Sequence, residues 1–148
     1  MANDAMSRFR NLGSGILLGP QPTEADLEQF KQQGVRTVVD MRPPGETASP
    51  NEDLVSRSGL AYANVPVSKA ELSSSLVDQL DGALERHEGG FLLHCATGAR
   101  AAMLLALSRA RRNQWTADRT FEEAKSMGFD LQTSPEYSSF VVQETRKQ

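Results

Sequence analysis

The only cysteine of the chain lies in a segment whose residue types suit nucleophilic chemistry. The segment is His94-Cys95-Ala96-Thr97-Gly98-Ala99-Arg100, between the apolar residues 91–93 and the apolar run 101–107. This pattern predicts a strand, a short loop and then a helix. The first N–H groups of a helix have no intrahelical partners and carry the positive end of its dipole. We therefore expect this loop to favour an anion at its centre.

Its position predicts that Cys95 is ionised near neutral pH. The unpaired N–H groups and the guanidinium of Arg100 both favour a thiolate, so we expect the pKa of Cys95 to lie below that of free cysteine. Gly98 would let the backbone approach a ligand closely. The alternative is a small buried hydrophobic residue, the commoner situation for a lone cysteine. The glycine and the arginine in the same loop favour a nucleophile that acts on an anionic or sulfur-bearing group.

The composition is that of a soluble globular protein. The 148 residues are 39% apolar and 24% charged, which suits a single domain over residues 1–148. A formal net charge of −3 argues against general nucleic-acid binding, and no apolar run is long enough to span a membrane. The start of the chain has no secretory signal pattern, and a single cysteine suits a reducing compartment. We therefore expect a cytoplasmic protein.

Neither a metal site nor a cofactor is expected from the sequence. One cysteine and two histidines without ligand spacing do not form a metal site. The segment Gly13-Ser14-Gly15 predicts a hairpin turn rather than a nucleotide-binding loop, because no long helix follows it.

Predicted strands and helices alternate along the chain. Strands are expected at 9–12, 16–18, 35–41, 60–65 and 91–94. Helices are expected from Thr23 to Gly34, from Pro50 to Ser58, from Ser73 or Ser74 to near Gly89, from the cysteine loop to about Arg112, and from Ser134 onward. The capping-box spacing at Thr120 opens or interrupts a further helix that ends at Gly128. This alternation predicts an α/β sandwich with a central, mostly parallel sheet of about five strands, and the cysteine loop at the carboxyl end of a strand.

The loop from His94 to Arg100 resembles the signature loop of the cysteine-dependent protein-tyrosine phosphatase superfamily. The resemblance is closest to the small bacterial phosphatase-like domain of the beta-lactamase hydrolase-like family, and it covers most of the chain. It includes the segments 19–22, 37–43, 65–67 and 122–130. The resemblance implies a three-layer sandwich of the dual-specificity type that hydrolyses a phosphate ester, so the partner would be an anionic small molecule or a phosphorylated substrate.

The resemblance also implies roles for the loop residues. Cys95 would attack phosphorus and form a phosphocysteine, and Arg100 would hold the phosphoryl oxygens in a bidentate manner. His94 would position the thiol and make it more acidic. The anion would be held by N–H groups from four residues, Ala96, Thr97, Gly98 and Ala99.

Two local features depart from the superfamily and support other hypotheses. Four residues separate Cys95 from Arg100, where these phosphatases usually have five, and Ala101 replaces their usual hydroxyl residue. A four-residue loop is typical of rhodanese-like sulfurtransferases, in which Cys95 would carry a persulfide from a sulfur donor to a thiol acceptor. A third hypothesis is a non-catalytic module that binds an anion or phospho-ligand. We favour the phosphatase, because the resemblance spans the chain and the departures are local.

The general acid that would protonate a leaving alkoxide is the least certain part of the predicted site. Glu71 is the only acidic residue in the loop after the fourth predicted strand, but a carboxylate near a helix start is the commoner role for such a residue. Asp40 and Asp130 are remoter candidates. Arg42 follows a strand that ends at the same sheet edge, where it would either bind an anion or pair with Glu46.

Overall fold

A computed structural model describes residues 8–46 and 51–146. Within them, five strands form one sheet in the order β1-β2-β5-β3-β4. The strands are β1 (Arg10–Asn11), β2 (Ile16–Gly19), β3 (Thr37–Asp40), β4 (Ala61–Asn64) and β5 (Phe91–His94). Only β1 runs antiparallel to its neighbour, in a hairpin with β2. The prediction of a mostly parallel five-stranded sheet is confirmed.

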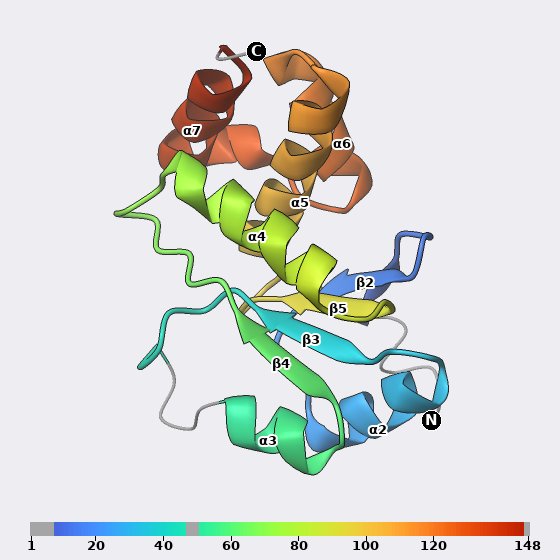
Figure 1. The fold of residues 1–148 in the computed structure, drawn as a ribbon. Coiled ribbons are helices and arrows are strands. Elements are labelled where there is room, and N and C mark those ends of the chain that lie inside the picture. Colours follow the sequence, from blue (N-terminus) through green and yellow to red (C-terminus); the bar gives the residue numbers. More distant parts are fainter. Residues whose placement is uncertain (1–7, 47–50, 147–148) are drawn as a thin grey trace.

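Helices cover both faces of this sheet and make three layers (Figure 1). One face carries α2 (Glu24–Gln32) and α3 (Asn51–Arg57). The opposite face carries α4 (Ser74–Arg86) and α5 (Ala99–Asn113). The helices α6 (Ala117–Ser126) and α7 (Pro135–Arg146) pack against α5 on its far side, with a short 3₁₀ turn, η1 (Leu131–Thr133), between them. No helix in the described ranges is long and apolar enough to span a membrane.

The central strands are buried on both sides, because their side chains alternate between two apolar clusters. Val38 and Leu92 pack with α2 and α3, whereas Val39 and Leu93 pack with the opposite layer. This double burial explains why these strands read as continuous apolar runs. In the larger cluster α5 contacts α4, α6 and α7. The start of α5 is thereby fixed behind the carboxyl end of β5.

Hydroxyl caps set the starts of two helices, and one of them was placed wrongly from the sequence. The prediction that α2 begins at Thr23 is confirmed, and Thr23 and Asp26 form a capping box there, with bonds of 2.9 and 3.1 Å. The prediction that Thr120 opens or interrupts a helix is wrong. Thr116 caps α6 by accepting a bond from the Arg119 N–H at 3.1 Å, and Thr120 lies one turn inside the helix. Thr120 is fully buried and donates its hydroxyl to the Thr116 carbonyl, so it has no capping role.

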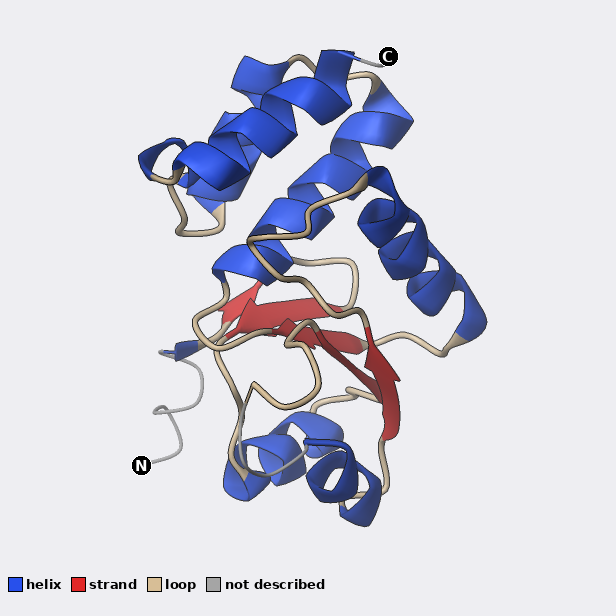
Figure 2. Ribbon diagram, turned by 90° about the vertical axis from the view of Figure 1, so that its left-hand side faces the viewer, coloured by secondary structure: helices blue, strands red, loops and turns tan. Residues whose placement is uncertain are grey.

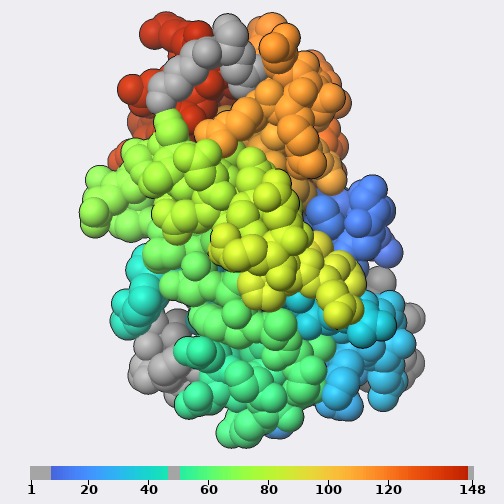
Figure 3. All heavy atoms as spheres, in the orientation of Figure 1, coloured from blue at the N-terminus to red at the C-terminus, as the bar shows by residue number. Residues whose placement is uncertain are grey.

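The carboxyl ends of the four parallel strands lie in register at one edge of the sheet. Gly19 of β2 and Asp40 of β3 both align with His94 of β5, and Asn64 of β4 aligns with Asp40. Figure 2 shows this edge toward the viewer, with loops in front of the strands. In the space-filling view, the cyan segment that follows β3 stands out at the left of the molecule (Figure 3). The loops after β3, β4 and β5 therefore converge at one side of the domain.

Candidate active site

The Cys95 sulfur accepts a hydrogen bond from one backbone amide of its own loop. The residue is fully buried, and its Sγ accepts a hydrogen bond from the Gly98 N–H at 3.0 Å. Gly98 is the N-cap of α5, which begins with the bond from the Ala102 N–H to the Gly98 carbonyl at 2.9 Å. The strand–loop–helix arrangement expected from the sequence is present, with the sulfur at the start of a helix.

Gly98 is required by both its backbone conformation and its surroundings. Its φ is +112°, in the region where residues with a side chain are strained. A Cβ atom there would lie 2.8 Å from the ring of Phe129 and 3.4 Å from the carbonyl carbon of Gly19. The neighbouring Thr97 is exposed, and its hydroxyl accepts a bond from the Ala99 N–H at 3.3 Å. The Thr97 side chain thus supports the loop backbone.

Arg100 reaches back from the first turn of α5 to two other loops. Its Nη1 and Nη2 donate to the Glu46 carboxylate at 2.7 and 2.8 Å, and Nη1 also donates to the Val67 carbonyl at 3.0 Å. The hydrogen bonds to Glu46 raise the pKa of Arg100 and lower that of Glu46, so both are charged. A guanidinium has five N–H donors in a rigid plane, and these contacts use three. The two others, Nε–H and one N–H of Nη2, point the same way and have no partner within the described ranges.

His94 is a neutral, fully buried residue in this structure. Its Nε2 lies 2.9 Å from Nδ2 of Asn51, which can only donate, so the ring proton is assigned to Nδ1. Nδ1 then donates to the Cys95 carbonyl at 3.2 Å. Burial lowers the pKa of His94 to about 4, so its 3.9 Å approach to Asp40 is no ion pair at neutral pH. His94 therefore holds the backbone of the nucleophile.

Asp40 and Arg42 form a buried ion pair beside His94. Arg42 donates through Nε and Nη2 to Asp40 at 2.9 and 3.0 Å, and the Tyr62 hydroxyl donates to Asp40 at 2.9 Å. Burial opposes ionisation of Asp40, but the bonds from Arg42 outweigh it and lower the pKa of Asp40. The pairing of Arg42 with Glu46, one of its two predicted roles, is wrong. Arg42 pairs with Asp40, and both carboxylate oxygens of Glu46 accept hydrogen bonds from Arg100.

The two remaining acidic candidates lie in turns. Glu71 is exposed, and its N–H closes a turn to the Ser68 carbonyl at 3.0 Å. Asp130 caps η1 by accepting a bond from the Gln132 N–H at 3.0 Å, and it lies 4.0 Å from Lys125. The structure gives Asp130 a local capping role, and it leaves Glu71 at the surface of the loop after β4.

Sequence reasoning missed a residue that the C-terminal helix brings to the site. Tyr137, in the first turn of α7, is half-buried, and Nζ of Lys69 lies 4.9 Å from the centre of its ring. Burial raises the pKa of Tyr137, and the positive charge of Arg100 opposes that shift. Tyr137 lies about forty residues beyond the cysteine loop in the sequence, and no local pattern marks it.

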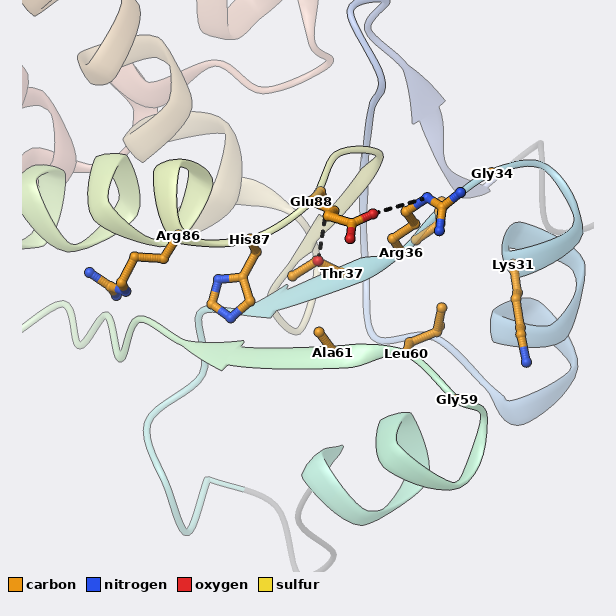
Figure 4. Close-up of a pocket in the computed structure, with 11 residues that line it drawn as sticks. Lys31, Gly34, Arg36, Thr37, Gly59, Leu60, Ala61, Arg86, His87 and Glu88 are labelled. Atoms are coloured by element: carbon orange, nitrogen blue, oxygen red, sulfur yellow. Dashed lines mark hydrogen bonds and ion pairs between the residues drawn. The ribbon is translucent and has the colours of Figure 1, made fainter.

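A cavity lies at the opposite end of the sheet from the cysteine loop, where β3 and β4 begin (Figure 4). It has a volume of about 590 Å³, and Glu88 is one of the residues that line it. The Glu88 carbonyl accepts a bond from the Thr37 hydroxyl at 2.9 Å, and its carboxylate lies 3.6 Å from Arg36. Lys31 and Arg86 occupy the last turns of α2 and α4, where cations offset the helix dipoles. The lining charges therefore have a structural role, away from Cys95.

The comparison with known protein families agrees with the geometry of the cysteine loop. Residues 8–112 match the phosphatase-like domain of beta-lactamase hydrolase-like proteins. The chain belongs to this family. A beta-lactamase hydrolase-like protein of Xylella fastidiosa (strain 9a5c) is 30% identical over 129 residues, which are 84% of this chain and 30% of that protein. One from Agrobacterium fabrum (strain C58 / ATCC 33970) is 25% identical over 121 residues, 78% of this chain and 28% of that protein. The phosphatase-like chain thus spans less than a third of these relatives.

Solved structures share the fold of this phosphatase-like domain. A DUF442 protein from Shewanella putrefaciens superposes with a TM-score of 0.80 at 18% identity, covering 98% of this chain and 95% of that one. Pseudomonas aeruginosa TpbA, in complex with pTyr, has a TM-score of 0.73 at 17% identity over 97% and 91% of the two chains. The core catalytic domain of the Saccharomyces cerevisiae PP-IP phosphatase SIW14, in complex with citrate, has a TM-score of 0.71 at 19% identity over 90% and 82%. The fold is that of the protein-tyrosine phosphatase superfamily, and these comparisons do not support the sulfurtransferase alternative.

Proposed function

We propose that this phosphatase-like domain hydrolyses phosphorylated substrates through a phosphocysteine on Cys95. The observation that carries the proposal is the arrangement around the sulfur. The Gly98 N–H points at Sγ from 3.0 Å, while the edge of Arg100 formed by Nε and Nη2 has no partner among the described residues. A phosphoryl group in front of the sulfur would find donors on both sides.

The reaction then proceeds in two displacements. The Cys95 thiolate attacks phosphorus, the bond to the leaving oxygen breaks, and phosphocysteine forms. The two adjacent N–H groups of Arg100 fit two phosphoryl oxygens, and the loop amides supply further donors where charge develops. Water then attacks phosphorus, the P–S bond breaks, and the Gly98 N–H stabilises the departing sulfur anion.

Several neighbouring groups act as positioning residues in this proposal. Glu46 and the Val67 carbonyl hold the guanidinium of Arg100 from behind, at 2.7–3.0 Å. His94 holds the Cys95 carbonyl and is itself fixed by Asn51. The ligands of two relatives, pTyr for TpbA and citrate for SIW14, support an anionic or phosphorylated ligand for this site as well.

Hydrolysis of p-nitrophenyl phosphate tests the proposal. Cys95→Ser should abolish turnover, and Arg100→Lys should lower kcat/KM by about 100-fold, because lysine lacks the planar fork. Arg57→Lys, an exposed residue of α3, is the matched control and should retain activity. Turnover that survives in Cys95→Ser would contradict the proposal. No turnover, with phosphate still raising the melting temperature, would instead identify a binding module.

A further inference from the structure

Four titratable side chains around the Cys95 loop are poor proton donors. The carboxylate of Glu46 is held ionised by Arg100, and that of Asp40 by Arg42. The ring proton of His94 is committed to the Cys95 carbonyl. Burial raises the pKa of the Tyr137 phenol, which makes it a weaker acid than usual. A leaving alkoxide would need a proton within hydrogen-bond reach, and these groups do not supply it.

A cation stands at the rim of the same site. The bond from Arg100 to the Val67 carbonyl, at 3.0 Å, ties the loop after β4 to the catalytic loop. Lys69 is two residues further on, within about 7 Å of chain. Its Nζ lies over the ring of Tyr137 at 4.9 Å, and the positive charge of Arg100 acts on the Tyr137 phenol. Within the described ranges Lys69 forms no ion pair, so its ammonium is available to an incoming anion.

We propose that Lys69 receives the leaving group and that the preferred substrates are phosphoanhydrides, molecules that carry a pyrophosphate group. This inference rests on the function proposed above. A departing phosphate is a stable anion that needs no proton, whereas an alkoxide is not. A nearby ammonium lowers the energy of the charge that develops on the departing oxygen. The site therefore favours substrates whose leaving group is a stable anion without added protonation.

The bonds and electrons of the reaction balance without an added acid. The thiolate of Cys95 forms the P–S bond, and the bond from phosphorus to the bridging oxygen breaks. The departing phosphate takes that electron pair and binds near Lys69. Water then attacks phosphocysteine, the P–S bond breaks, and sulfur leaves as the thiolate. The proton released by the water passes to the product phosphate or to solvent.

A panel of three substrates tests the inference on the intact chain. The substrates are inorganic pyrophosphate, glycerol phosphate as an alkyl ester, and p-nitrophenyl phosphate as an ester with a good leaving group. We expect kcat/KM for pyrophosphate to exceed that for glycerol phosphate by at least about 100-fold. Lys69→Met should lower the ratio of pyrophosphate to p-nitrophenyl phosphate turnover by about tenfold. Lys125→Met, an exposed lysine of α6, is the control and should leave that ratio unchanged.

Each other outcome points to a specific failure. Equal turnover of glycerol phosphate and pyrophosphate, or an unchanged ratio in Lys69→Met, would overturn the inference while the phosphatase proposal stands. Loss of glycerol phosphate turnover in Glu71→Gln would also overturn it, because Glu71 would then be the missing acid. If p-nitrophenyl phosphate is not hydrolysed at all, the function proposed above fails, and this inference fails with it.

Discussion

Arg100 and Glu46 form a bidentate ion pair across 54 residues of sequence, with N–O distances of 2.7 and 2.8 Å. The pair fixes the guanidinium end-on, since Nη1 and Nη2 both face the carboxylate. The side edge of the guanidinium, formed by Nε–H and one N–H of Nη2, makes no contact with Glu46 and has no partner among the described residues. Glu46 therefore orients the arginine of the cysteine loop without using the donors that an anion would need.

Replacement of Glu46 by glutamine tests this orienting role. An amide gives Arg100 one acceptor instead of two and removes the charge, so the guanidinium loses its fixed plane. We expect kcat/KM for p-nitrophenyl phosphate to fall by about tenfold, with only a small change in melting temperature because the pair is partly exposed. Vanadate affinity should weaken in parallel. Glu28→Gln, on the exposed face of α2, is the control. Unchanged kinetics in Glu46→Gln would show that Arg100 is positioned by other contacts.

A pair of glycine substitutions separates backbone strain from steric conflict at the loop. Gly34 and Gly98 both have positive φ, +104° and +112°, but a Cβ at Gly34 meets nothing within 4 Å. Gly34→Ala should therefore cost only about 1 kcal/mol of unfolding free energy and keep activity. Gly98→Ala should cost about 2–4 kcal/mol and abolish p-nitrophenyl phosphate turnover, because the methyl group collides with Phe129. Urea unfolding and kinetics measure both effects. Equal costs for the two variants would show that Phe129 moves aside easily.

The burial of His94 predicts a loss of stability in mild acid. Its pKa of about 4 in the folded protein lies below the ordinary value of 6.5, so the unfolded chain binds this proton first as the pH falls. The free energy of unfolding should therefore drop by roughly 2 kcal/mol between pH 7 and pH 5. Above pH 7 the contribution of His94 should be flat. His94→Gln should remove this slope, whereas His87→Gln, at the end of α4, should keep it. A wild-type stability that is constant from pH 7 to pH 5 would contradict the assigned neutral state.

The local part of the site was predictable from sequence because its signals are contiguous. An apolar strand, a cysteine, a glycine and an arginine within ten residues dictate a strand–loop–helix unit, and the Gly98 N–H is directed at Cys95 as that unit requires. The same locality explains the correct prediction of a helix start at Thr23. The local pattern also produced the wrong prediction at Thr120, because the hydroxyl of Thr116, one turn earlier, caps the helix instead.

The supporting contacts were not predictable, because they join distant segments. Glu46 reaches Arg100 across 54 residues, and Asn51 reaches His94 across 43. Both partners lie on the segment after β3, which meets the cysteine loop only because β3 and β5 are neighbours in the sheet. Strand order is set by tertiary packing, which a single sequence does not encode in any local pattern.

The formation of a phosphocysteine on Cys95 is the central claim, and intact mass after rapid acid quench tests it most directly. Brief mixing with p-nitrophenyl phosphate should add one phosphoryl group to the wild-type chain and none to Cys95→Ser. The adduct should disappear as hydrolysis completes. A chain that gains no phosphoryl group, but gains one sulfur atom from thiosulfate in a manner that depends on Cys95, would contradict the phosphatase mechanism.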